Sequence, residues 1–594
     1  MVNARIADLV DQRSSHPTDR RCRAMEKGRP LVDDSAPCQD ERPQGSRLTR
    51  RTLLGQVTAI GVGAIAADAL ATPAAASPAI QHGNVTRAAQ EAGTPTGQIL
   101  RAANMSELTT LHPFMTRFTS AKAAAYHINE GLTKFEADFS IVPGLATEWV
   151  VSDDQLTLTF TLRQGVMWHD GQPLTAKDVR FTLDAAGASD SQSPALGVMT
   201  EYVQSVETPD DGTVVITLTK PYSPLLAVLA EQLLILPSHI LEGNVYDDEF
   251  SQLPIGTGPY RVAERQTSFI TLEHNPDYWG EPPFTATIIL RDAPDAAAAQ
   301  AGLLAGELEV VGYDPTTMEP LLEQGFQVFQ GLAGSIHGLD VDLQNPILQD
   351  LKVRQALMLG LDRERIKEVQ YANGLMAKSV ISPAYGQYHD ESLPDIARDI
   401  EAAGALLDEA GWTVGADDIR EKDGQPLALR FQAWAAQSWQ NIAAITQASW
   451  KEIGVDVTIE TVELARLVDT LSGTYDIAPN GWNPGSDPIL GLTVLFGTTD
   501  KTIKDGGTNN VFHYTNPDVD AALAEAYATT DVAQRVELAH QVQQQVVQDL
   551  PFLILAHPRY ELMCTANIVL DETGTGELCS VGTGFFMNRW RVEG

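Results

Sequence analysis

A stretch of alternating apolar and polar residues predicts a strand in the first third of this chain. Leu156, Leu158, Phe160 and Leu162 alternate with three threonines and an arginine. Successive side chains of a strand point to opposite faces, so one face of this strand should lie in a core and the other in water. We therefore expect a half-buried antiparallel sheet here.

The residues after this strand predict a chain reversal and a helix start. Asp170 and Gly171 form a common turn pair. Thr175 suits a helix N-cap, with Asp178 at the capping-box position three residues later. His169 and Asp170 could suggest catalysis, but we favour a role in holding the turn.

Periodic segments continue along the rest of the chain. Strand patterns occur at 98–103, 214–219, 261–263, 287–291, 455–461 and 552–555, and helical spacing occurs at 351–370, 402–412, 440–453 and 517–551. The helix at 440–453, followed by Gly454 and a strand, implies layers of helices and strands. The expected fold class is mixed α/β.

Export is predicted by the first 76 residues. Arg50 and Arg51 precede an apolar run from Val57 to Ala67, and small residues end at Ala76. This order is typical of a twin-arginine signal with cleavage after Ala76. The run is shorter than the roughly 20 residues that span a bilayer, so a membrane anchor is the less favoured alternative. Ser77 follows, where a lipoprotein would have cysteine, and we expect an exported periplasmic or cell-envelope protein without a lipid anchor.

The net charge of the chain limits the classes of partner that it is expected to bind. Residues 1–76 hold 11 Lys and Arg and 9 Asp and Glu, which leaves 30 basic and 69 acidic residues and a net charge near −39. Such a charge repels nucleic acid and anionic lipid, and it could attract cationic ligands. The simpler interpretation is a solvated surface on a soluble protein, which we expect to be a monomer.

Two cysteines, Cys564 and Cys579, follow the predicted leader. In an oxidising compartment they could pair and close a loop of about 15 residues, which would stabilise the fold by up to roughly 3 kcal/mol. The sequence leaves pairing and two free thiols equally open.

The 518 residues after the leader exceed what one core usually organises, so at least two lobes are expected. Residues 77–96 are small and polar, which indicates a flexible linker. Several motifs then follow in order, at 128–133, 146–181, 256–260, 275–280, 353–363 and 480–488. In this order the chain resembles the extracellular solute-binding proteins of the oligopeptide, dipeptide and nickel family, family 5, over nearly all of 97–594.

The resemblance implies a two-lobed fold of the type II periplasmic-binding-protein kind, with a ligand cleft between the lobes. It places the first lobe at 97–290 and 560–594, with an inserted subdomain at about 146–250, and the second lobe at 291–559. The function implied is that of a receptor that captures a small solute and delivers it to the membrane permease of an ABC importer.

The same resemblance indicates ligand-binding residues. In the second lobe, Trp482 matches the family's ligand loop and would form a flat apolar wall, although it could instead be part of a core. The polar residues expected around it are Asn480, Asn483 and Ser486, and a second expected cleft-lining loop holds Trp434, Gln437, Ser438 and Trp439. Asp487 is expected to be a turn residue. The first-lobe candidates are Met105, Ser106, Glu107 and Thr119.

The ligand loop also departs from that of dipeptide receptors, which carry an acidic residue between Gly-Trp and Asp-Pro. Residues 483–486 include no carboxylate. Burying an ammonium group without a counter-charge costs several kcal/mol, so peptide binding in that arrangement is in doubt unless Glu107 substitutes. A sugar-like solute stacked on tryptophan is the alternative. The histidines (His112, His127, His337, His513 and His557) show no metal-ligand spacing, so we expect structural roles for them.

An enzyme is the competing class of function. The sequence has no G-x-S-x-G, H-E-x-x-H, C-x-x-C or phosphate-loop motif. We therefore expect a binding protein without catalysis or cofactor. A chaperone-like binder of unfolded exported chains is a third alternative, and it would bind many long peptides weakly.

Overall fold

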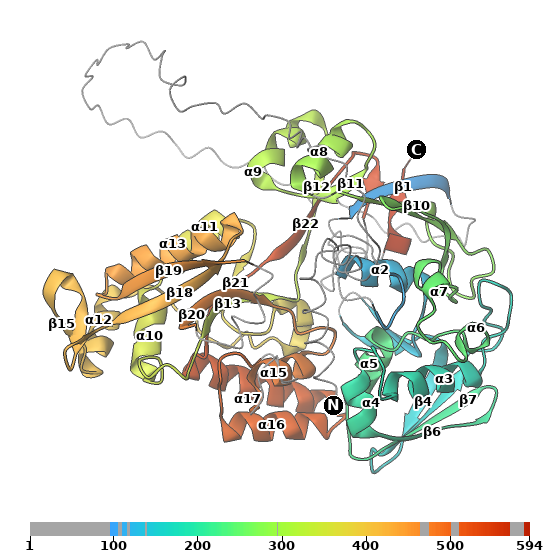
Figure 1. Ribbon diagram of the computed structural model, residues 1–594, viewed down its shortest axis with the longest axis horizontal. Helices are drawn as coiled ribbons and strands as arrows, with labels where there is room; N and C mark the ends of the chain where they lie inside the picture. Colours follow the sequence, from blue (N-terminus) through green and yellow to red (C-terminus); the bar gives the residue numbers. More distant parts are fainter. Residues whose placement is uncertain are drawn as a thin grey trace, which may run out of the picture. The chain divides into compact units, whose positions relative to one another are not determined.

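The computed structural model (Figure 1) describes residues 96–104, 110–115, 119–136, 139–293, 295–463, 475–499, 510–570 and 587–593. The chain divides into two units between residues 82 and 83, and all described residues belong to the second unit. The expected signal residues Arg50, Arg51 and Ala76 lie outside the described residues, as do residues 77–95 of the expected linker. Among the described helices, none combines the length and the apolar character that crossing a bilayer requires.

The first large sheet has seven strands in the order β12-β22-β11-β1-β10-β9-β8. Their bounds are β1 Thr96–Asn104, β8 Tyr260–Arg265, β9 Phe269–His274, β10 Thr285–Asp292, β11 Val310–Gly312, β12 Gln327–Leu332 and β22 Arg559–Cys564. Strand β1 is parallel to both neighbours, β10 and β11. Parallel strands need a crossover, and helix α8 (Ala296–Leu304) provides it between β10 and β11.

This crossover bears on where the first lobe ends. The Ala-rich segment after residue 290 was expected to begin the second lobe, but α8 returns the chain to the same sheet, which continues to Leu332 in β12. We therefore propose that the first lobe ends after Leu332 and resumes at Arg559. The proposed end of the first lobe lies after the boundary at 291 that the resemblance implies, and the proposed return lies one residue before the implied position at 560.

The strand predicted from the Leu/Thr alternation lies in a separate four-stranded antiparallel sheet, ordered β4-β5-β7-β6. Its strands are β4 Ala146–Val151, β5 Thr157–Leu162, β6 Val203–Asp210 and β7 Thr213–Leu218. Leu158, Phe160 and Leu162 are at most 4% exposed, whereas the threonines between them are more exposed. The half-buried antiparallel sheet is thus confirmed.

The predicted turn and helix start are also confirmed. Gly171 has a left-handed φ of 83°, as the turn requires. Asp178 accepts a hydrogen bond from the Thr175 amide at 2.9 Å and caps α3 (Ala176–Gly187). The ring of His169 contacts the main chain of Gly256 and Gly258 at 3.2 and 3.1 Å. His169 therefore has the structural role that the sequence suggested.

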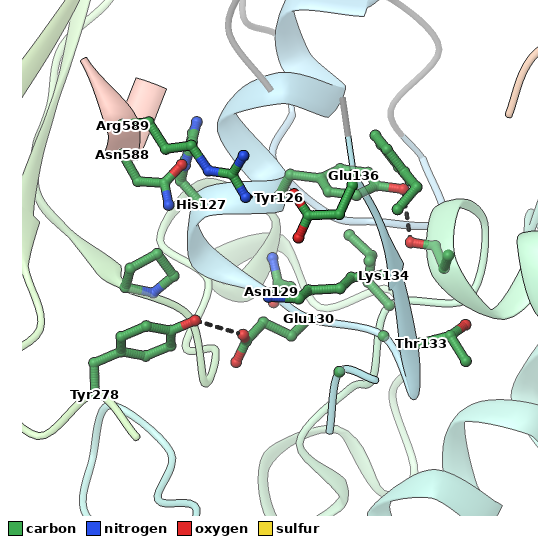
Figure 2. A pocket seen from close by; sticks show the side chains of 16 residues that line it. Tyr126, His127, Asn129, Glu130, Thr133, Lys134, Glu136, Tyr278, Asn588 and Arg589 are labelled. Carbon is green, nitrogen blue, oxygen red and sulfur yellow. Dashed lines mark hydrogen bonds and ion pairs between the residues drawn. The ribbon is translucent and has the colours of Figure 1, made fainter. Parts of the chain in front are cut away.

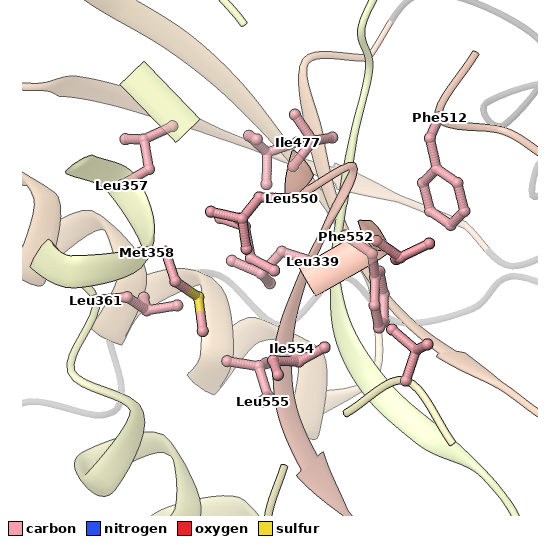
Figure 3. Close-up of a cluster of buried hydrophobic side chains, with 14 of the residues drawn as sticks. Leu339, Leu357, Met358, Leu361, Ile477, Phe512, Leu550, Phe552, Ile554 and Leu555 are labelled. Carbon is pink, nitrogen blue, oxygen red and sulfur yellow. The ribbon is translucent and has the colours of Figure 1, made fainter. Parts of the chain in front are cut away.

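The second large sheet has six strands in the order β14-β21-β13-β20-β18-β19. Their bounds are β13 Ile336–Val341, β14 Leu375–Met376, β18 Ala428–Trp434, β19 Asp456–Val462, β20 Ile477–Trp482 and β21 Phe552–His557. Figure 3 shows part of the core beside this sheet, where Leu339, Ile477 and Phe552 belong to the same buried cluster as Leu357 and Leu361. The cluster of buried hydrophobic side chains in this core is the largest such cluster among the described residues.

The longer helices in the described part of the second lobe are α10 Leu351–Gly360, α11 Arg363–Gln370, α12 Ile400–Glu409, α13 Gln437–Lys451, α15 Pro488–Phe496, α16 Pro517–Tyr527 and α17 Val532–Asp549. The single helices expected over 351–370 and 517–551 are each two helices. Asp362 accepts a hydrogen bond from the Arg365 amide at 3.0 Å, and Asp531 accepts one from Ala533 at 2.9 Å. These side chains cap new helices and so interrupt the helical runs.

Shorter elements complete the described chain. They are α2 Thr119–Ile128, β2 Thr133–Phe135, β3 Ile141–Pro143, α4 Leu196–Tyr202, α5 Leu225–Glu231, α6 Ser238–Leu241, α7 Asp248–Gln252, α9 Pro315–Met318, η2 Glu319–Gln324, η3 Pro383–Tyr388, β15 Thr413–Val414, η4 Ala416–Asp418, β16 Arg420–Lys422, β17 Gln425–Pro426, β23 Ile568–Val569, η7 Met587–Arg589 and β24 Arg591–Val592. Cys564 ends β22 and is buried, and Cys579 lies outside the described residues, so whether the two pair stays open.

Candidate ligand-binding site

The loop that contains Trp482 leaves the middle of the second sheet. Strand β20 pairs with β13 in antiparallel register, with Trp482 opposite Ile336. After the strand, the Asn483 side chain accepts a hydrogen bond from the Gly485 amide at 3.0 Å, and Gly485 has a φ of 82°. Asp487 then caps α15 by accepting bonds from the next amides. Asp487 is thus a helix cap, in line with the turn role expected for it.

Trp482 is half-buried and lies between a core and a cavity. Its ring packs edge-on against Phe512, with centroids 6.4 Å apart, and its side chain also lines the cavity described below. The indole Nε1 donates to the Asp340 carboxylate at 2.9 Å. Trp482 is therefore held in a fixed orientation with part of its surface available to a ligand.

Asp340 is a fully buried carboxylate that supports this loop. Its two oxygens accept from Trp482 and, at 3.0 Å, from the Asn480 side chain. Burial raises the pKa of Asp340 to about 7, even though both hydrogen bonds act in the opposite direction. The Asn480 side chain thus donates its hydrogen bond to Asp340, and Asn480 lines neither of the two cavities described below.

We predict that Asp340→Asn changes the pH dependence of stability. The folded pKa lies above the usual unfolded value, so the protonated carboxyl stabilises the fold fully below about pH 4, and this stability is lost as pH rises through about 7. Urea unfolding at pH 5 and pH 8 measures the free energy of unfolding of both proteins. From pH 5 to pH 8, the free energy of unfolding of Asp340→Asn should rise relative to that of the wild type by on the order of 2 kcal/mol. Asp184→Asn, on an exposed helix face, is the control and should follow the wild type. Parallel pH profiles for Asp340→Asn and wild type would contradict the assignment.

A cavity of about 440 Å³, here called the Trp482 cavity, is lined by both lobes. From the first lobe it is lined by Lys122, Phe139, Pro194, Val198, Glu231 and Gln232, and from the second by Trp482, Asn483, Pro484, Gly485, Leu490, Gly491, Val494 and Leu495. A solute in this cavity would contact the ligand loop, helix α15 and the end of α5 at the same time.

A second cavity of about 600 Å³, the Tyr388 cavity, is also lined by both lobes. The first lobe contributes Phe139, Ser140, Ile141, Trp149, Ser223, Leu226 and Ala227, and the second contributes Tyr385, Gly386, Gln387, Tyr388, Ser486, Asp487, Pro488, Thr530, Val532 and Arg535. Its one ion pair among these residues joins Arg535 and Asp487 at 2.6 Å. Phe139, Trp149, Tyr385 and Tyr388 contribute aromatic rings to its wall.

The two cavities share Phe139, which stacks on Tyr385 of the other lobe with ring centroids 4.2 Å apart. The Tyr385 hydroxyl donates to the Gly485 carbonyl at 2.6 Å. The lobes also meet where the Ser223 amide donates to the Tyr527 carbonyl at 2.9 Å. The lobes are thus in direct contact around both cavities.

Helix α15 packs closely against the ligand loop. A Cβ on Gly491 would lie 2.2 Å from the Cβ of Pro484 and 2.5 Å from its Cα. Only glycine lets the helix approach the loop this closely, since both neighbouring atoms belong to a rigid ring or to backbone. The loop position therefore depends on the helix that Asp487 caps.

The cavities contain three of the expected second-lobe residues, since Trp482 and Asn483 line the first and Ser486 lines the second. The expected cleft-lining loop at 434–439 is different in the structure. Trp434 ends β18 and is 4% exposed in the second-lobe core, and α13 already begins at Gln437. The apolar face of α13 continues upstream of the predicted helix start, which is why Gln437, Ser438 and Trp439 are helical; none of these four residues lines either cavity.

The first-lobe candidates cannot be placed in the same way. Met105, Ser106 and Glu107 lie outside the described residues. Thr119 begins helix α2, and its side chain is likewise not described. Within the described part of the first lobe, the two cavities are lined by Lys122, Phe139, Glu231 and the other residues above, which sequence reasoning missed because no local pattern marks them.

A smaller cavity of about 100 Å³ lies within the first lobe (Figure 2). Glu130 accepts hydrogen bonds there from Thr257, Tyr278 and Trp279 at 2.9, 3.0 and 2.8 Å. Burial raises the pKa of Glu130 to about 7. Because one lobe alone forms this cavity, it cannot link a ligand to lobe closure.

The five histidines considered for nickel each have a partner within the fold. His112 contacts the Val245 carbonyl at 2.8 Å, and the rings of His127 and Tyr260 pack edge-on. The others contact Tyr371, Asp342 and Ser335: His337 at 3.0 Å, His513 at 2.9 Å and His557 at 3.4 Å. Within the described ranges, no group of three or more metal-ligating side chains is close enough to hold a metal ion.

Two α/β lobes with cavities lined by both define a receptor that closes around a solute. The chain belongs to the bacterial extracellular solute-binding proteins, family 5, whose family model matches residues 140–502. Members of this family are the solute receptors of ABC importers. The resemblance inferred from the sequence motifs is confirmed.

Individual relatives agree with this assignment. The dipeptide-binding protein of Escherichia coli K12 is 30% identical over 475 residues, which cover 74% of this chain and 86% of that protein. The oligopeptide-binding protein AppA of Bacillus subtilis, solved with a nonapeptide, superposes with a TM-score of 0.69 at 26% identity and covers 84% of this chain and all of that one. NikZ of Campylobacter jejuni, solved with Ni(L-His), gives a TM-score of 0.72 at 25% identity, also covering 84% of this chain and all of that one.

Proposed function

We propose that this receptor captures a short peptide or a similar small solute between its lobes and delivers it to an ABC permease. The observation that carries the proposal is the pair of cavities, about 440 and 600 Å³ in volume, each lined by both lobes. A ligand that contacts both lobes favours their closed arrangement by its differential affinity for it. Relatives named for dipeptides and oligopeptides support peptide as the solute class.

The test is a thermal unfolding series on the purified protein. Pools of di- to pentapeptides, a nickel–histidine mixture and an oligosaccharide pool are each titrated, because a ligand that binds only the folded state raises the melting temperature. We expect the peptide pool to raise the melting temperature increasingly with its concentration, and mass spectrometry should recover peptides from the protein. Stabilisation by oligosaccharides alone would overturn the peptide assignment in favour of a sugar receptor.

We propose that the protein acts as a monomer and without catalysis or cofactor. Its relatives are binding proteins, which supports the absence of catalysis. Chromatography of the peptide pool after incubation with the protein tests for catalysis. Unchanged peptides are expected, whereas new cleavage products would indicate a hydrolase, and weak binding of many long unfolded chains would indicate a chaperone.

We also propose export by the twin-arginine route without a lipid anchor, on the basis of Arg50, Arg51 and the residues up to Ser77. Replacing both arginines by lysine should leave the uncleaved precursor inside the cell, because this route reads the arginine pair itself. Cell fractionation followed by immunoblotting measures the effect. Export at the wild-type level would contradict the proposed route.

A further inference from the structure

Residues 483–486 of the ligand loop include no carboxylate, yet the other lobe places one beside them. Glu231 is the last residue of α5. Its Oε2 accepts a hydrogen bond from the Ser486 amide at 3.2 Å and lies 3.7 Å from the position that a Cβ on Gly485 would occupy. A negative charge from the first lobe is thus positioned at the ligand loop of the second.

The charges around the Trp482 cavity are few. Among the described residues that line it, Glu231 is the one acid and Lys122 the one base. The Lys122 Nζ lies 3.5 Å from Glu231 Oε1, which is longer than the roughly 2.7–2.9 Å of a strong charge-assisted hydrogen bond. The Glu231 side chain is 16% exposed, so its charge is only weakly screened by water.

Glu231 also has room for a further donor. A carboxylate offers about four acceptor positions, and the contacts to Ser486 and Lys122 use two of them. A donor that reaches Oε1 at a shorter distance than Lys122 would gain a stronger bond. The apolar walls of Trp482 and Leu495 would surround the remainder of such a ligand.

We propose that Glu231 binds a protonated amino group of the solute and so determines that the cleft takes solutes with a free ammonium group, such as peptides with an unblocked amino terminus. This inference rests on the proposed function and specifies it. The carboxylate supplies the counter-charge that residues 483–486 lack, and it does so from the opposite lobe. Binding of the ammonium group at Glu231 therefore adds to closure, since the rest of the solute contacts the second lobe.

The physical alternative is a neutral solute that donates a hydroxyl to the same oxygen. Both donors would form a charge-assisted hydrogen bond with the ionised carboxylate, but only the ammonium group adds the attraction between two opposite charges. An ammonium ligand also compensates the charge of Glu231 when closure excludes water. An acetylated amino group loses both contributions and adds bulk.

The test compares two matched pools of tri- to pentapeptides, one with free and one with acetylated amino termini, in thermal unfolding of the wild type, Glu231→Gln and Glu242→Gln. Glu242 is an exposed first-lobe glutamate that pairs with Lys177 at 2.9 Å and lines neither cavity, so it is the matched control. We expect a given rise in the melting temperature of the wild type and of Glu242→Gln to need at least about tenfold less of the free pool than of the acetylated pool, a ratio that corresponds to about 1.4 kcal/mol. In Glu231→Gln this preference should disappear while the melting temperature without ligand stays near that of the wild type.

Each outcome distinguishes the inference from the proposed function. Equal stabilisation of the wild type by both pools would keep the peptide receptor and overturn the role of Glu231. A preference for free termini that persists in Glu231→Gln would likewise overturn that role. Stabilisation by neither pool would overturn the proposed function together with the inference. The wild-type comparison needs no variant, so it tests the inference even if Glu231→Gln is unstable.

Discussion

Trp482→Ala is expected to weaken solute binding by at least about tenfold, which corresponds to 1.4 kcal/mol or more. The substitution removes a ring that lines the Trp482 cavity and packs against Phe512. It also removes the donor to the buried Asp340 carboxylate, which costs stability as well. Titration calorimetry with the best-stabilising peptide measures the affinity, and urea unfolding at the same pH measures the stability.

Trp482→Phe separates the two contributions of the indole. Phenylalanine retains an aromatic wall but cannot donate to Asp340, so we expect lower stability and most of the binding affinity. Wild-type affinity in Trp482→Ala would show that the solute does not contact this ring. The Trp482 cavity would then not be the binding site.

Phe139→Ala is expected to have the second largest effect, because one side chain contributes to both cavities and to the contact between the lobes. Its ring stacks on Tyr385 at 4.2 Å and packs against the second-lobe core. A stacked aromatic pair contributes about 0.5–1.5 kcal/mol beyond its buried area, so about tenfold weaker binding is expected. Stopped-flow measurement should show that most of the loss is faster solute dissociation, because the closed arrangement is destabilised.

Two companion variants test the cause of this loss. Phe139 has a left-handed φ of 63°, which costs about 1 kcal/mol for a residue other than glycine. Phe139→Gly should therefore be more stable than Phe139→Ala while binding equally weakly. Tyr385→Phe retains the stacked ring and loses only the bond to Gly485, so its dissociation rate should lie between those of wild type and Phe139→Ala. Slow, wild-type dissociation in Phe139→Ala would contradict a role in closure.

Sequence reasoning predicted the local elements well where one face is buried and the other is in water. The strand with Leu158 and Phe160 and the helix start at Thr175 have patterns set by adjacent residues. It failed where a distant contact decided the outcome. The Ala-rich segment that forms α8 has no pattern to show that it returns to the first sheet, because strand β1, which it crosses, lies almost two hundred residues earlier.

Candidate residues were predicted in both lobes, and those of the second lobe can be located, whereas Met105, Ser106 and Glu107 lie outside the described residues. Trp482, Asn483 and Ser486 were found because they occur in a recognisable loop, and all three line a cavity. Asn480 was expected to contact solute, but a buried carboxylate on another strand, Asp340, binds its side chain. Glu231 and Ser486 are 255 residues apart in the sequence, and the residues around them form no pattern that predicts their contact.

The central claim is that a solute is held by both lobes at once, and hydrogen exchange with and without the free-amino peptide pool tests it most directly. Binding should slow amide exchange in the first-lobe segments around Phe139 and 225–232 and in the second-lobe segment 482–488, to a similar extent. Protection in one lobe alone, or saturable binding with no protection in either set of segments, would contradict the account.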